Sequence, residues 1–191
     1  MAQFINQAQR IKKFFIILLL LFAPACQSPK TSPVDLGVVI LQADAGWQSV
    51  APTSTMRKAQ FTLPRAAGDS EDAELVVYYF GADQGGPVEA NLERWYAQFS
   101  QPDGSSSAEK ARVAREVVDG MNLTTVDLSG TYVAPTMPGS EEHHNQPNFR
   151  MLAAVLETSQ GPYFFKLVGP EQTVVHWAKS FGQFMKSAKH K

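Results

Sequence analysis

FRMLAAVLETSQGPYFFKLV, residues 149–168, is the stretch that decides the fold. Its two apolar segments, 149–158 and 162–168, are separated by the short polar turn Ser159-Gln160-Gly161. Taken alone, the first segment is also compatible with a helix. Because a second apolar segment follows directly after the turn, we expect a pair of antiparallel strands instead.

Three segments upstream carry further strand patterns. In residues 56–64, MRKAQFTLP, the apolar Ala59, Phe61 and Leu63 alternate with polar residues, which predicts a half-buried strand that ends at Pro64. Residues 73–81, AELVVYYFG, are nearly all apolar and predict a central strand covered on both faces. Segments 111–118 and 121–133 flank Asp119-Gly120, a typical hairpin turn.

Two amphipathic helices are expected, each introduced by a Gly-Pro pair. The first begins near Pro87, and its apolar face is formed by Val88, Leu92, Trp95 and Phe99. The second spans about 171–187 after Pro170 and carries Val174, Trp177 and Phe181 on one face. The chain is therefore predicted to fold as an α+β domain, a mostly antiparallel sheet flanked by two helices.

This order of elements resembles the PsbP-like fold. The matching features are the early Trp47, the strand ending Phe61-Thr62-Leu63-Pro64, a helix between strands, a late hairpin and a closing helix with an aromatic face. The resemblance covers most of residues 45–188. It implies a PsbP-like sandwich and a role in binding or assembly, and it brings no catalytic motif.

The N-terminus has the three parts of a secretory signal. Arg10, Lys12 and Lys13 precede the apolar run FFIILLLLF at 14–22, and Ala23-Pro24-Ala25-Cys26 follows. A permanent transmembrane anchor is the alternative. Extended to residue 25, however, the apolar stretch would span only about 18 Å at ~1.5 Å per residue, short of the roughly 30 Å hydrocarbon core.

Cys26 is the only cysteine of the chain, so it cannot form an internal disulfide. Residues 23–26 resemble the lipobox of bacterial lipoproteins. That resemblance implies cleavage before Cys26 and a diacylglyceryl group on its sulfur, which would hold the protein at a membrane. Ordinary cleavage after Ala25, leaving a free thiol, is the alternative.

These features predict three parts: a signal peptide at 1–25, a lipidated N-terminus and flexible tether at 26–36, and a single α+β domain at 37–191. Since Gln27 is not acidic, we expect a location in the cell envelope at the periplasmic face of the outer membrane. Without residues 1–25, which hold three basic and no acidic residues, the chain has 14 basic and 18 acidic residues and a formal charge of −4. This charge disfavours nucleic-acid binding and attraction to anionic lipid.

The sequence shows neither a G-x-S-x-G nucleophile motif nor a phosphate-binding loop, and we expect no cofactor. The ligand-rich cluster Glu141-Glu142-His143-His144 is interpreted as a solvated loop. The alternative is a metal-dependent or other hydrolase that uses this loop. It would take His143 and His144 as metal ligands and require a further ligand, for example His176.

Four residues form a candidate binding site. Arg94 and Trp95 lie together on the first predicted helix, and Arg150 and Lys166 lie on the late hairpin. Cations beside an exposed aromatic ring could recognise an acidic or planar partner. The preferred interpretation is that Trp95 belongs to the core and that Arg94 is solvated or pairs with a nearby acid. Because the sequence carries no catalytic motif, we predict a non-enzymatic domain that binds a protein partner or another component of the envelope.

Overall fold

A computed structural model describes residues 30–137 and 139–191. The expected signal peptide and the lipidation site Cys26 lie outside these residues. In the described part of the chain, no helix is long and apolar enough to cross a membrane.

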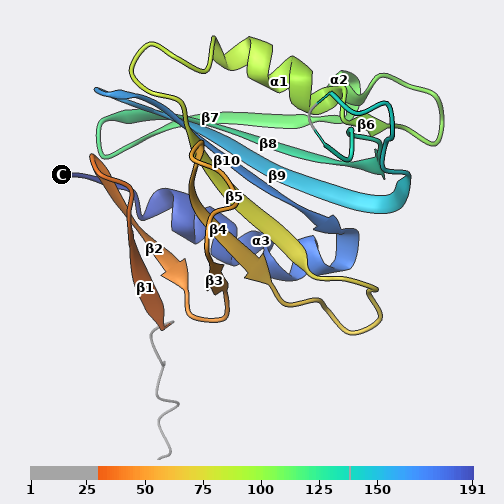
Figure 1. Cartoon of the computed structure of the whole chain (residues 1–191), viewed down its shortest axis with the longest axis horizontal. Helices are drawn as coiled ribbons and strands as arrows, with labels where there is room; N and C mark the ends of the chain where they lie inside the picture. The colour runs from red at the N-terminus through yellow and green to blue at the C-terminus, as the bar shows by residue number, and fades with distance from the viewer. Residues whose placement is uncertain (1–29, 138) are drawn as a thin grey trace, which may run out of the picture.

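The fold is a mostly antiparallel sheet with one helix against each face, as the sequence predicts (Figure 1). The strands of the main sheet run in the order β3-β4-β5-β10-β9-β8-β6, and β7 also pairs with β8. Their bounds are β3 Gln48–Val50, β4 Arg57–Leu63, β5 Ala73–Tyr79, β6 Phe99–Ser100, β7 Arg112–Val118, β8 Met121–Tyr132, β9 Gln146–Thr158 and β10 Gly161–Pro170. A second sheet pairs β1 Thr31–Asp35, β2 Val39–Asp44 and β11 Lys189–His190.

The strand pair β9–β10 lies at the centre of the main sheet and confirms the antiparallel pair that residues 149–168 predict. Thr158 pairs with Gly161 across the turn, and the register runs unbroken to Phe149 and Pro170. The β7–β8 turn is also confirmed. Asp119 and Gly120 both have positive φ, at 49° and 80°, the conformation that a tight two-residue hairpin requires.

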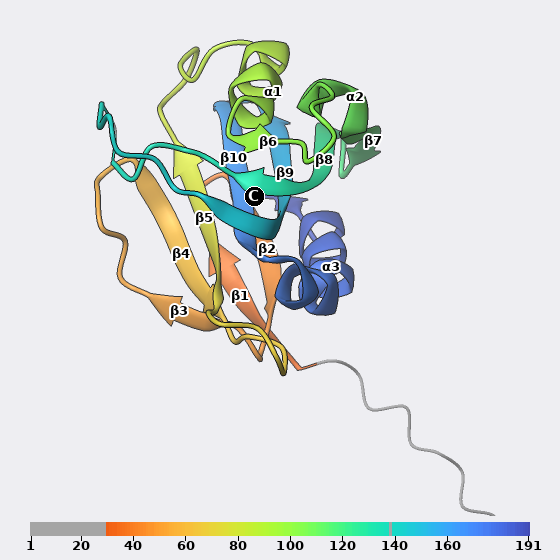
Figure 2. The same ribbon diagram turned by 90° about the vertical axis from the view of Figure 1, so that its right-hand side faces the viewer.

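Each helix covers one face of this sheet (Figure 2). Helix α3, Glu171–Lys186, packs Val174, Phe181 and Phe184 against one face. Helix α1, Val88–Tyr96, packs Leu92 and Trp95 against the other. A single helical turn, α2 Ser107–Lys110, follows β6. With nine residues against sixteen, α1 is the shorter of the two main helices.

The predicted flexible tether is wrong for residues 31–35, which form β1. Its sequence, TSPVD, has the Ser and Pro content of a linker, but β1 pairs with β2 in register, Val34 opposite Leu41. Pro33 has no N–H to donate, and β1 tolerates this because it lies at the edge of its sheet. The folded part of the chain therefore begins before residue 37.

Two strands lie at positions for which the sequence gives no clear strand pattern. Strand β9 begins at Gln146, before the apolar segment 149–158. The C-terminal residues Lys189 and His190 form β11 beside β2.

Candidate functional site

A concave pocket of about 390 Å³ opens on the α1 face of the sheet, beside β4 and β5. We call it the Lys166 pocket. Its lining residues are Arg57, Glu74, Val76, Tyr78, Gln98, Tyr132, Ala134, Pro135, Thr136, Met137, His144, Lys166 and Val168.

The strand register explains how polar side chains come together here. In β10, Phe165 and Leu167 point to the α3 face, so Lys166 between them points to the α1 face. Lys166 stands opposite Val76 in β5, and Val76 stands opposite Gln60 in β4. The next row on the same face holds Glu74 opposite Val168.

The loop after β8 forms one wall of the pocket. It folds back on itself, with Pro135 bridging His143 and the His144 N–H donating to the Ala134 carbonyl at 2.9 Å. Figure 2 shows this loop, in teal, extending past the side of the sheet that holds β5 and β4. The ring centroid of His144 lies 5.2 Å from that of Tyr132.

Lys166 is a largely buried cation without a carboxylate partner. Its Nζ donates to Gln98 Oε1 and, at 3.3 Å, to Tyr132 Oη, and it lies 5.3 Å from the centre of the Tyr132 ring. No Asp or Glu within residues 30–137 and 139–191 forms an ion pair with it. Burial disfavours the charged amine and lowers the pKa of Lys166 to about 8.

The one carboxylate of the pocket is already engaged. Glu74 Oε1 accepts hydrogen bonds from Gln60 Nε2 at 2.6 Å and from Arg57 Nη1 at 3.4 Å. The Arg57 guanidinium also lies over the ring of Tyr78, 5.8 Å from its centre. The charges of Arg57 and Glu74 thus compensate each other, and the positive charge of Lys166 remains uncompensated.

Tyr132 keeps its proton throughout the neutral range. Burial, followed by repulsion from Tyr78 and Glu74, raises the pKa of Tyr132 to about 12. Its hydroxyl oxygen accepts a hydrogen bond from Lys166 Nζ, so its own O–H remains available as a donor. The pocket therefore presents an ammonium and a neutral hydroxyl side by side.

The structure does not unite the four residues predicted to bind a partner. Lys166 lies in the pocket. Arg94 donates to the Gly85 carbonyl at 3.2 Å and to Asn91 Oδ1, which holds the turn before α1. Trp95 is 7% exposed and belongs to the core under α1, so the preferred interpretation of a core Trp95 is confirmed and its use as an exposed binding residue is wrong.

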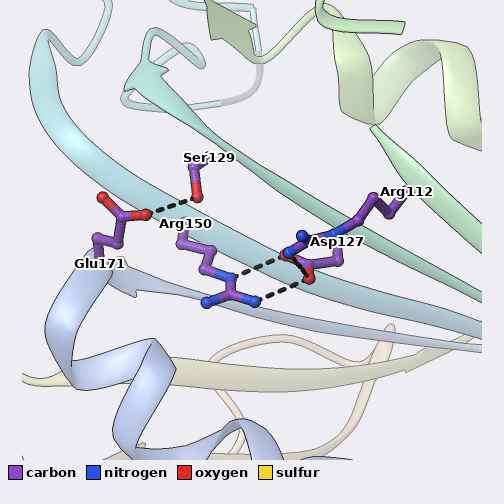
Figure 3. A network of polar contacts seen from close by, with 5 residues as sticks. All are labelled: Arg112, Asp127, Ser129, Arg150 and Glu171. Carbon is purple, nitrogen blue, oxygen red and sulfur yellow. Dashed lines mark hydrogen bonds and ion pairs between the residues drawn. The ribbon is translucent and has the colours of Figure 1, made fainter. Parts of the chain in front are cut away.

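Arg150 lies on the opposite face of the sheet from Lys166, because it pairs with Gly169, three residues along β10 from Lys166. Figure 3 shows Arg150 beside Asp127. Its Nε and Nη2 each donate to Asp127 across 2.7 Å, and Arg112 reaches the same carboxylate, also at 2.7 Å. Burial would raise the pKa of Asp127, but the hydrogen bonds from Arg150 and Arg112 outweigh it and lower that pKa. Nearby, Ser129 Oγ donates to Glu171 Oε1 at 3.0 Å, which joins β8 to α3. Arg150 is therefore part of a structural network.

The alternative metal site does not form. His143 is exposed, and its Nδ1 contacts the Glu141 carbonyl at 2.9 Å. His176 lies in α3, on the opposite side of the sheet from the loop that holds His143 and His144. In the described ranges, no group of three or more His, Cys, Asp or Glu side chains is placed to hold a metal ion.

Sequence reasoning singled out Lys166 but missed the residues around it. Arg57, Glu74, Tyr78 and Tyr132 come from three strands, and only the register brings them to one face. The one signal in the sequence is the polar residue Lys166 inside the otherwise apolar segment YFFKLV.

No known protein family matches the sequence of this chain. No curated protein matches it either. Among solved structures, it is similar to cyanobacterial PsbP (CyanoP) from Synechocystis sp. PCC 6803, with a TM-score of 0.52 and 11% identity over 90% of this chain and 99% of that one. This likeness confirms the predicted PsbP-like fold.

Two further structures align less well. The Ran-binding protein Mog1p of Saccharomyces cerevisiae gives a TM-score of 0.47 at 11% identity and covers 85% of this chain and 96% of its own. Protein PA94 of Pseudomonas aeruginosa gives 0.45 at 13% identity and covers 82% and 94%.

Proposed function

We propose that this protein is a lipid-anchored envelope protein whose PsbP-like domain binds a protein partner, without catalysis, through the Lys166 pocket. The anchor is the diacylglyceryl group expected on Cys26, and the location is the periplasmic face of the outer membrane. The observation that supports binding is the buried ammonium of Lys166, which has no carboxylate partner in the described chain.

A buried cation without a counterion is costly for a fold. Desolvation of an ammonium is offset only when an opposite charge or a full set of hydrogen bonds replaces water. Strongly perturbed ionisable groups in concave sites are typical of functional sites. The opening of about 390 Å³ falls within the size range of ligand sites, so a partner group can reach the amine.

The binding half of the proposal can be tested with a photo-crosslinking residue in intact cells. It is placed at Met137, 67% exposed on the rim, and as a matched control at Val175, 52% exposed on α3. We expect a defined crosslink from position 137 that disappears with Lys166→Met and is absent from position 175. Equal crosslinks from both positions, or a rim crosslink unaffected by Lys166→Met, would contradict binding through the pocket.

The anchor is tested separately by intact mass and membrane fractionation. The native protein should be heavier than the chain from Cys26 by its acyl groups, and Cys26→Ala should leave the membrane fraction. An unmodified, soluble wild-type protein would overturn this half of the proposal.

A further inference from the structure

The charge count of the Lys166 pocket selects one class of ligand group. Arg57 and Glu74 compensate each other at 3.4 Å, and burial raises the pKa of Tyr78 and of Tyr132, so both tyrosines are neutral. Lys166 then leaves one net positive charge. A monoanion neutralises this charge, whereas a phosphate dianion would leave an excess negative charge in a partly desolvated site.

The donors of the pocket also match a planar anion with two oxygens. An ammonium has three N–H donors, and Lys166 uses one toward Gln98 and one toward Tyr132. No hydrogen bond from its third donor is found within the described residues. The Tyr132 hydroxyl, next to it, has its own proton to give. The two free donors can thus reach the two oxygens of one carboxylate.

The rest of the lining suits a short organic group behind that carboxylate. Val76, opposite Lys166, and Val168, opposite Glu74, provide an apolar floor. Tyr78 and His144 add ring surfaces to the lining. Such surfaces contact the body of a ligand while the polar groups fix its orientation.

We infer that the Lys166 pocket takes a carboxylate, with one oxygen on Lys166 Nζ and the other on the Tyr132 hydroxyl. This inference rests on the proposed function, in which a partner protein supplies the group. In a protein the carboxylate belongs either to the chain terminus or to an Asp or Glu side chain.

Binding of a carboxylate is coupled to the proton on Lys166. The charged and titratable groups that face this amine, from all elements around it, are Arg57, Glu74, Tyr78, Tyr132 and His144. Since the protonated amine is the binding form, the apparent Kd should weaken about tenfold between pH 7 and pH 9, as the protonated fraction falls.

The test is an NMR titration of the full protein with three ligands that share a benzene ring. Chemical shifts of the α+β domain report binding. Benzoate should bind in the pocket at pH 7, while neutral benzamide and phenyl phosphate, which is mostly dianionic at that pH, should bind at least tenfold more weakly. Lys166→Met should weaken benzoate tenfold or more, and Tyr132→Phe about threefold. Lys179→Met, on the exposed surface of α3, should leave the Kd unchanged. Equal binding of benzamide, or benzoate binding that is insensitive to Lys166→Met and to pH, would overturn the inference.

Two capped tripeptides distinguish the source of the carboxylate. One carries only a free C-terminus, and the other is amidated and carries a single Asp side chain. Tighter binding of either one, with the pH dependence above, supports the inference and identifies the source. If a rim crosslink at position 137 depends on Lys166 but neither tripeptide nor benzoate binds, the proposed function stands and the carboxylate assignment fails.

Discussion

The two faces of the sheet treat a buried cation in opposite ways. On the α3 face, Arg150 is 14% exposed and makes a bidentate pair with Asp127 at 2.7 Å. On the α1 face, Lys166 is also partly buried, but it contacts only a neutral amide and a phenol. The first cation is satisfied within the fold, and the second is not.

The difference follows from how far each helix reaches. Helix α3, with sixteen residues, covers its face and contacts β9, β10 and β2. Helix α1, with nine, leaves the β4–β5 side of its face uncovered, where the pocket opens. A closed face requires its charges to be paired, whereas an open pocket can hold a charge for a ligand.

The largest expected effect on stability is on the α3 face, where Arg150 and Asp127 are paired. Arg150→Met should lower the free energy of unfolding by about 3 kcal/mol, because the half-buried Asp127 would keep only Arg112 as an ionic partner. Urea unfolding at pH 7 measures this. Arg112→Met, whose side chain is 76% exposed, is the control and should cost less than about 1 kcal/mol. Similar losses in the two variants would contradict the structural role of Arg150.

On the α1 face, loss of the cation should change the free energy of unfolding in the opposite direction. Lys166→Met should raise the free energy of unfolding at pH 7 by about 2 kcal/mol. A pKa lowered from 10.5 to about 8 corresponds to roughly 3 kcal/mol of unfavourable burial, and loss of the hydrogen bond to Gln98 offsets about 1 kcal/mol. Lys179→Met should change stability by less than about 0.5 kcal/mol. A destabilised Lys166→Met variant would show that the amine supports the fold.

The unfavourable burial of the Lys166 ammonium should also appear in the pH dependence of stability. Because the folded-state pKa of Lys166 lies below its unfolded value, the unfolded chain binds more protons between about pH 8 and pH 10.5, and stability from this group rises with pH there. From pH 7.5 to pH 9.5, the wild type should gain roughly 1.8 kcal/mol relative to Lys166→Met. Parallel stability profiles for the two proteins would contradict the lowered pKa.

The smallest effect should come from the contact that joins β8 to α3. Ser129→Ala removes the 3.0 Å hydrogen bond to Glu171 and should cost about 1 kcal/mol or less. Because this contact lies on the α3 face, away from the Lys166 pocket, the Kd for benzoate should not change. A weakened Kd would show that the two faces are coupled.

Local patterns predicted most of the fold. The alternation in 58–63, the apolar pair around the 159–161 turn, and Asp119-Gly120 are each visible within a short segment of the sequence. Each forms the strand or turn that it predicts. The strand β1 was missed because its stability comes from pairing with β2, which a Ser- and Pro-containing segment does not reveal.

The site was predicted only in part, through Lys166. Arg150 was grouped with it because both are cations on one hairpin, yet the register already separates them. Arg150 stands opposite Gly169, three residues from Lys166, and an odd spacing along a strand changes the face. Which other polar residues join Lys166 depends on contacts between β4, β5 and the loop after β8, which no local pattern encodes.

The most direct test of the central claim is the titration of Lys166 itself, followed by NMR of its ¹³Cε with and without saturating benzoate. An unpaired buried amine that receives a carboxylate should titrate with a pKa near 8 in the free protein and at least one unit higher in the complex. A pKa near 10.5 in the free protein, unchanged by benzoate, would contradict the account.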